Sequence, residues 1–127
     1  MAYETEGLTL DPTVTLAGVR AVLADPGRGR YFVAELDDRV VGQLMVTPEW
    51  SDWRAVWFWW IQSVWVAPEY RGRKVYRALH DHLLAEARRQ GIFSLRLYVD
   101  RENRRAQAVY EALGMRHSHY DLFERET

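Results

Sequence analysis

The chain has 127 residues, 48% of them hydrophobic and 13% aromatic, and a formal net charge of −1. These values predict a single domain over residues 1–127 with a real core, and they exclude a disordered chain. The near-neutral charge argues against a nucleic-acid partner, and the lack of cysteine excludes a disulfide scaffold, a thiol nucleophile and a thiolate metal site. With no apolar stretch of about 18 residues and no leader pattern, we expect a cytoplasmic protein that binds no membrane.

The first elements expected along the chain are a helix and a hairpin. The helix is expected from Thr13 to Leu23, because Asp11 can cap it and Pro12 suits its first position. Two strands follow, over Tyr31–Leu36 and Val40–Thr47, joined at a tight two-residue tip.

A polar loop and a long apolar strand are expected next. Pro48–Arg54 carries two acids and two tryptophans and is interpreted as a loop. The nearly unbroken apolar run Val56–Val66 is typical of a central strand covered on both faces. Gly42, inside the preceding strand, indicates a bulge or a close backbone approach.

Pro68 ends the long strand, and an amphipathic helix then runs to about Gln90, with Gly91 as its left-handed end. Its apolar stripe consists of Val75, Leu79, Leu83 and Ala87. We expect a strand over Phe93–Val99, parallel to the long strand because a helix connects the two.

The remaining elements are expected to be a helix over Asn103–Leu113, an exit at Gly114 and a last strand over Met115–Phe123. Strands that alternate with helices in this order predict an α/β fold with a mixed sheet. The histidines fall in two i, i+2 pairs, and we predict no metal site from them.

The turn between the long strand and its helix concentrates positive charge. Arg71, Arg73 and Lys74 surround Gly72, which lets the backbone approach a ligand closely. The free N–H groups and the dipole at a helix N-terminus attract phosphate there. The turn therefore predicts a pyrophosphate site rather than a site for a lone carboxylate.

Two segments carry a family resemblance. VAPEYRGRKVYRAL resembles the acetyl-CoA-binding segment of the GNAT superfamily of N-acetyltransferases, in which Arg or Gln, two residues, Gly, one residue and then Gly or Ala form the signature. Here Lys74 and Tyr76 occupy the two small positions, so that the motif is degenerate and the effect of Lys74 on the cofactor stays open. LYVDRENRRAQAVYEALGMR, from Leu97 to Arg116, resembles the later segment of the family.

The resemblance implies a GNAT-like fold with a central mixed sheet flanked by helices, and acetyl-CoA as cosubstrate. The cofactor-binding residues that it implies are Val64, Trp65, Val66, Arg71, Gly72, Arg73, Lys74, Val75, Tyr76 and Asn103. It also implies acetyl transfer to a primary amine of a small molecule or protein, by direct attack in a ternary complex. Tyr110 corresponds to the proton donor for the thiolate, although a packed helix aromatic remains an alternative.

The general base is less defined than the proton donor. The long strand offers no acid, and the nearest in sequence are Glu49 and Asp52, while water alone is a further possibility. A non-catalytic acyl-CoA-binding or interaction domain remains the competing reading of the whole chain.

A homodimer is expected from the edges of the sheet. The family usually begins with a strand that the front of this chain does not supply, so Tyr31–Leu36 is an edge unless residues 3–10 or a partner cover it. Pairing of these strands and exchange of the last segment are both open routes to a two-fold dimer.

Overall fold

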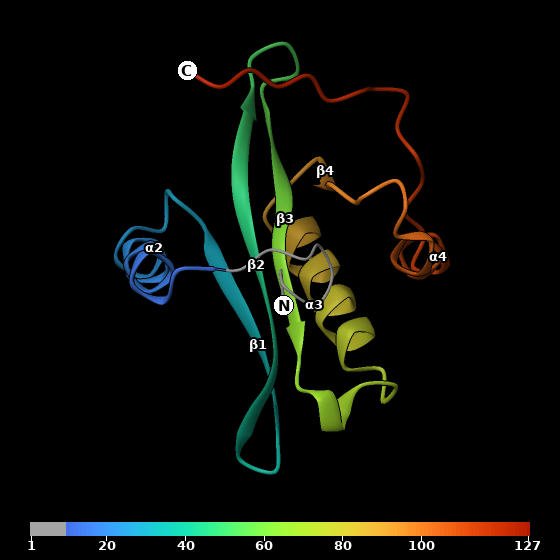
Figure 1. Cartoon of the computed structure of the whole chain (residues 1–127). Helices are drawn as coiled ribbons and strands as arrows, with labels where there is room; N and C mark the ends of the chain where they lie inside the picture. Colours follow the sequence, from blue (N-terminus) through green and yellow to red (C-terminus); the bar gives the residue numbers. More distant parts are fainter. Residues whose placement is uncertain (1–9) are drawn as a thin grey trace.

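A four-stranded mixed sheet flanked by helices makes up residues 10–127, the part of the chain that this computed structural model describes (Figure 1). The helices are α2 (Pro12–Ala24), α3 (Val75–Arg89) and α4 (Arg104–Ala112), and η1 (Pro68–Tyr70) is a short 3-10 turn. The strands, in their order across the sheet, are β1 (Arg30–Leu36), β2 (Arg39–Ser51), β3 (Val56–Val66) and β4 (Ser94–Leu97). The pairs β1–β2 and β2–β3 are antiparallel and β3–β4 is parallel, which confirms the predicted fold class.

The predicted helix ends are confirmed by their capping contacts. The Asp11 carboxylate accepts a hydrogen bond from the Thr13 N–H at 2.8 Å, and the Asn103 side chain accepts one from the Ala106 N–H at 3.1 Å. Gly91 and Gly114 leave α3 and α4 with φ values of 73° and 93°. These satisfied groups fix where α2, α3 and α4 begin or end.

Gly42 lies where α3 packs tightly against the sheet. A Cβ on this residue would lie 2.9 Å from Val75 Cγ1 and 3.2 Å from the Trp65 carbonyl oxygen. The β1–β2 register also shifts between Ala34 and Glu35, next to this glycine. The sequence interpretation of Gly42 is therefore confirmed.

The expected loop over Pro48–Arg54 is wrong, because β2 continues to Ser51 and only residues 52–55 form the turn. The rings of Trp50 and Trp57 lie 5.1 Å apart across the two strands. Cross-strand aromatic pairs of this kind stabilise a hairpin, and they outweigh the polar composition of the segment.

The expected strand over Met115–Phe123 is also wrong, since residues 115–127 form neither helix nor strand. In Figure 1 this segment, drawn in red, leaves α4 and runs along the outside of the molecule to the end marked C. A strand exists only where its backbone is paired, and this segment is paired with no strand in the described structure. The parallel strand is likewise shorter than expected, at Ser94–Leu97 instead of Phe93–Val99.

The core lies between α3 and one face of the sheet. Val75, Leu79, Leu83 and Ala87 are all buried, as the apolar stripe predicted. They belong to one cluster with side chains of β2 and β3.

No helix in residues 10–127 is long and apolar enough to cross a membrane. From the sequence, no first strand is expected at the front of the chain unless residues 3–10 form it. Of these residues, only residue 10 lies within the described part of the chain.

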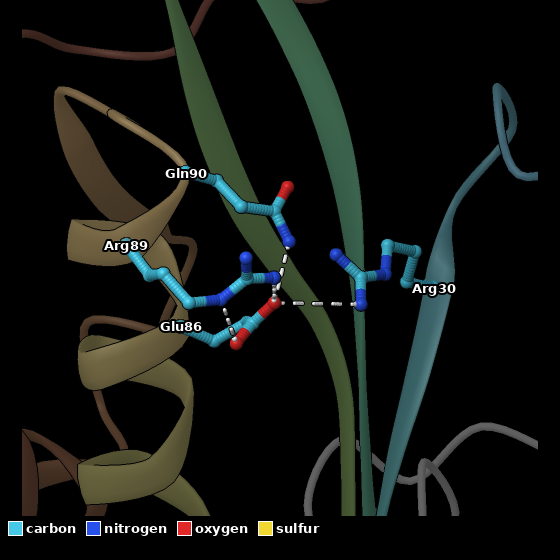
Figure 2. A network of polar contacts seen from close by, with 4 residues as sticks. All are labelled: Arg30, Glu86, Arg89 and Gln90. Atoms are coloured by element: carbon cyan, nitrogen blue, oxygen red, sulfur yellow. Dashed lines mark hydrogen bonds and ion pairs between the residues drawn. The ribbon is translucent and has the colours of Figure 1, made fainter.

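One polar network ties the end of α3 to β1 (Figure 2). Glu86 accepts hydrogen bonds from the Arg89 guanidinium and, at 2.6 Å, from the Gln90 amide, and Arg30 Nη2 lies 3.9 Å from the same carboxylate. The hydrogen bonds from Arg89, followed by that from Gln90, lower the pKa of Glu86 to about 2. The Glu86 carboxylate is therefore charged in the folded protein at neutral pH.

Candidate active site

The turn between β3 and α3 has the backbone shape that the glycine-rich pattern requires. Gly72 has φ 77°, and Lys74 has φ 62° and ψ 24°, in the left-handed region. A non-glycine residue held there costs on the order of 1–2 kcal/mol, and such strain persists only where the surroundings impose it. Lys74 thus takes a conformation that glycine adopts without a steric cost, and its side chain is exposed.

Backbone N–H groups at this turn have no partner within the helix. Lys74 is the N-cap residue of α3 and makes no side-chain capping bond, and the helical ladder starts with the Ala78 N–H donating to the Lys74 carbonyl at 3.1 Å. The N–H groups of residues 75–77 precede that bond. Free N–H groups at the N-terminus of a helix attract anions.

Residues of η1 and the residues just after it hold the turn in place through side-chain contacts. Tyr70 is buried, and its hydroxyl donates to Asp37 Oδ2 at 3.4 Å. Arg71 Nε donates to the Val66 carbonyl at 3.1 Å, and the guanidinium of Arg73 lies 5.3 Å from the centre of the Tyr70 ring. Arg71 therefore holds the turn together, while the exposed Arg73 stacks on a buried platform beside the free N–H groups.

The two parallel strands separate where β3 approaches the turn. Their pairing ends at Ile61↔Leu97, yet β3 continues to Val66 with β2 on its other side. The β2–β3 register shifts at this point, so that Gln62 is an extra residue in β3. In the described structure, residues 62–66 therefore have one backbone edge without a neighbouring strand, which suits an extended ligand arm that carries amides. The predicted residues Val64, Trp65 and Val66 lie along this edge.

Tyr110, on α4, lies beside the first turn of α3. Its ring lies 6.1 Å from that of Tyr76, in the first turn of α3, at an angle of 75°. Burial raises the pKa of Tyr110. Burial, with Tyr110 as the second cause, raises the pKa of Tyr76, whose hydroxyl has no hydrogen-bond partner among the described residues. Both phenols are thus protonated at neutral pH, as a proton donor must be.

Glu49 lies on β2 and not in a loop. Its Oε1 accepts a hydrogen bond from Trp60 Nε1 at 2.6 Å, and the Trp60 ring stacks on Tyr98 with ring centres 4.6 Å apart. Trp59 and Ile61 are buried in the α3-side core, so that the alternating Trp60 faces the other side of the sheet. A fixed carboxylate beside stacked aromatic rings can bind an ammonium group and accept its proton.

The predicted residues do not all come together. Asp52 is exposed in the turn at the end of the β2–β3 hairpin, where its carboxylate accepts from the Trp53 N–H at 3.0 Å. Asn103 begins α4, and its carbonyl oxygen is used in capping, which leaves the amide N–H groups for a ligand.

Sequence reasoning missed Arg96 and Tyr98. The Arg96 guanidinium lies 3.9 Å from the centre of the Phe58 ring, beside the Trp60–Tyr98 stack. The sequence did contain a sign of this pair. Arg96 and Tyr98 are two residues apart after the crossover helix, and in extended backbone this spacing places both side chains on one face.

Comparison with known proteins gives consistent matches. The model of the acetyltransferase (GNAT) family matches residues 4–115. The crystal structure of a possible acetyltransferase from Clostridium difficile 630 is 43% identical, with a TM-score of 0.94 over 99% of this chain and 84% of that one. A structure of AAC(6')-Iy in complex with a bisubstrate analogue of CoA is 19% identical, with a TM-score of 0.78 over 92% of this chain and 81% of that one, and it shows likeness of fold alone.

A curated relative, the mycothiol acetyltransferase of Kocuria rhizophila, is 28% identical over 128 aligned positions. The match covers 84% of this chain but only 42% of that protein. The chain thus spans less than half the length of this relative.

Proposed function

The chain belongs to the acetyltransferase (GNAT) family, and from this premise we propose that it transfers an acetyl group from acetyl-CoA to a primary amine by direct attack in a ternary complex. The family match confirms the predicted family, enzyme class and cosubstrate at the level of the family. The acceptor, a small molecule or a protein amine, belongs to the proposal.

The observation that carries the proposal is the continuity between the open edge of β3 and the left-handed turn. The free edge at residues 62–66 is followed by η1 and then by the turn at the N-terminus of α3, with Gly72 and Lys74 in the left-handed region. The extended thioester arm of the cofactor can pair with the open edge of β3. Its pyrophosphate can accept hydrogen bonds from the free N–H groups at the N-terminus of α3. Arg73 and Lys74 add charge beside the phosphates, and Asn103 faces them from α4 in this proposal.

In the proposed reaction, Glu49 takes a proton from the bound ammonium group, and the neutral amine attacks the thioester carbonyl carbon. Backbone N–H of the β3 edge stabilises the developing oxyanion. The C–S bond then breaks, and Tyr110 gives its proton to the departing thiolate. The attached nitrogen loses its second proton to water as the amide forms, Glu49 also releases its proton to water, and Tyr110 takes one proton back from water, so that one proton in total is released to solvent.

Glu49 serves better as the base than Asp52, the other acid weighed from the sequence. Its carboxylate is held by Trp60 on the face of β3 opposite α3, whereas Asp52 lies in the hairpin turn. The two stacked rings of Trp60 and Tyr98 supply a surface that binds a cation and excludes water.

The experiment that separates catalysis from mere binding has two readouts. Thermal shift with acetyl-CoA, CoA and ATP measures binding, and release of free thiol over an amine panel measures transfer. A shift with CoA but no thiol release with any amine would favour the non-catalytic acyl-CoA-binding alternative.

Two variants test whether CoA binds at the turn between β3 and α3. Arg73→Ala should weaken CoA binding about 10-fold or more, because a charge-assisted contact contributes roughly 1.5–3 kcal/mol. Arg20→Ala, which removes an exposed arginine of α2, is the matched control and should bind normally. Equal affinity of the two variants would remove Arg73 from the site.

A further inference from the structure

Arg96, on β4, is a charged side chain that stacks on rings and has no acidic partner. Its guanidinium lies 3.9 Å from the centre of the Phe58 ring and 5.8 Å from that of the Trp60 ring. Within residues 10–127, the Arg96 side chain donates no hydrogen bond and pairs with no carboxylate. Stacking uses the face of the guanidinium, so the N–H donors in its plane are free for a ligand.

Two other arginines of the sheet are paired with acids, unlike Arg96. Arg30 lies 3.9 Å from the Glu86 carboxylate, and Arg39 lies 3.2 Å from that of Glu69. Arg96 is half-buried, so it has given up part of its water without gaining a counter-charge. A charge in that position is costly until an opposite charge binds to it. The state of Arg96 therefore points to a ligand with an anionic group.

Arg96 and Glu49 lie on the same face of the sheet, opposite α3. Glu49 pairs in register with Phe58, and Arg96 pairs in register with the next residue but one of β3, Trp60. Paired residues of neighbouring strands project to one side, and so do residues two apart on one strand. Because β3 lies between β2 and β4, the acid and the guanidinium approach this aromatic surface from its two sides.

The two charges do not neutralise each other in the described structure. The Glu49 carboxylate is held at the edge of the Trp60 ring by the 2.6 Å hydrogen bond from Nε1, and it forms no ion pair with Arg96. Tyr98, stacked on the same ring at 4.6 Å, widens the aromatic surface around them. A carboxylate and a guanidinium that share one aromatic surface match a molecule that carries an ammonium group and an anion.

From this arrangement we propose that the acetyl acceptor is a primary amine that also carries an anionic group, a carboxylate or a phosphate, which Arg96 binds while Glu49 receives the ammonium group. This inference rests on the proposed function, because it names the class of acceptor for the same site. The fork of N–H donors on a guanidinium fits two oxygens of either anion. Arg96 thus determines specificity by a contact away from the reacting nitrogen.

Thiol release from acetyl-CoA with matched pairs of amines tests the class of acceptor. Each pair is an amine with an acidic group and the same amine with that group replaced: an amino carboxylic acid and its amide, or an aminoalkyl phosphate and its alcohol. Several methylene groups between the two ends keep the pKa of the amine similar within a pair. The wild type should have a kcat/KM about 10-fold or more higher for the acidic member, through a lower KM.

The pair that shows the preference distinguishes a carboxylate from a phosphate. Equal values within every pair, or higher values for the neutral members, would overturn the proposal while leaving acetyl transfer intact. Thiol release with no amine at all would overturn the proposed function and this inference with it.

Variants of two arginines that stack on the same ring assign the preference to Arg96. Arg96→Gln should raise the KM of the acidic member about 10-fold or more, with the neutral member and the CoA affinity unchanged, and Arg96→Lys should keep part of the preference. Arg54→Gln is the matched control, because the exposed Arg54 lies 5.9 Å from the Phe58 ring but makes no described contact with Trp60.

The control variant should keep the full preference for the acidic member. A rise in KM that is equal for both members of a pair in Arg96→Gln would make Arg96 a packing residue and overturn its role. Loss of the preference in Arg54→Gln as well would trace it to the general positive charge and would equally overturn that role.

Discussion

The body of the molecule, made of β1, β2, β3 and α3, is packed very differently from the periphery, made of α4 and the segment after it, residues 115–127. The side chains with the least exposure all belong to the body: Phe58, Leu44, Leu83, Val41 and Val46. α4 has no buried residue, although it carries Tyr110. The body thus stabilises the fold and shapes the phosphate turn, while the proposed proton donor comes from the part of the chain that contributes least to the core.

The sharpest expected contrast is between Leu83→Ala and Val109→Ala. Leu83 is fully buried on α3, so its truncation should lower the free energy of unfolding by about 2–5 kcal/mol. Val109, on α4, is 43% exposed, and its truncation should change that energy by less than about 0.5 kcal/mol in a single copy. Urea unfolding of both variants measures the two values, and equal losses would erase the distinction between body and periphery.

Tyr110→Phe should separate chemistry from stability in the periphery. The variant keeps the ring that packs on Tyr76 and removes only the hydroxyl, so turnover should fall by roughly 10²-fold with the free energy of unfolding and the CoA affinity intact. Single-turnover thiol release measures the rate. Normal turnover would leave Tyr110 as a packing residue.

Lys74→Gly should stabilise the protein by roughly 0.5–1 kcal/mol, because glycine takes the left-handed conformation without a Cβ clash while losing more chain entropy. Lys74→Ala is the matched control, since it removes the charge and keeps the Cβ. Denaturant unfolding and CoA titration of both variants address the question left open by the sequence. Tighter CoA binding in the glycine variant alone identifies the Cβ as an obstacle, and weaker binding in both identifies the charge as useful.

The smallest expected effect concerns Glu86, at the edge of the body. Its pKa is about 2 in the fold, below its ordinary value of 4.5, so its contribution to stability is complete above pH 4.5 and is lost as the pH falls toward 2. Glu86→Gln should therefore lower the melting temperature near pH 7 and approach the wild type near pH 2. A constant difference across this range would contradict the role of its charge.

The sequence predicted the body better than the periphery, and the reason is physical. The stripe from Val75 to Ala87, the Asp11 and Asn103 caps and the glycine exits depend on residues within one or two turns. The added length of β2 depends on the contact between Trp50 and Trp57, which only the folded hairpin brings together.

The site shows the same limit. The basic turn was predicted because its residues are consecutive, whereas the pairing of Glu49 with Trp60 and of Trp60 with Tyr98 joins three strands. The strand predicted over Met115–Phe123 was wrong, because an alternating pattern favours extended backbone but does not show which strand would pair with it.

Whether CoA binds at the turn and the β3 edge can be measured by titrating the isotopically labelled chain with CoA and following its backbone amide resonances. We expect saturable shifts of the amide resonances of residues 72–77 and of residues 62–66 along the β3 edge, and no shifts in α2. Saturable shifts confined to other residues, or no shifts at all at millimolar CoA, would contradict the assignment of this turn and edge as the cofactor site.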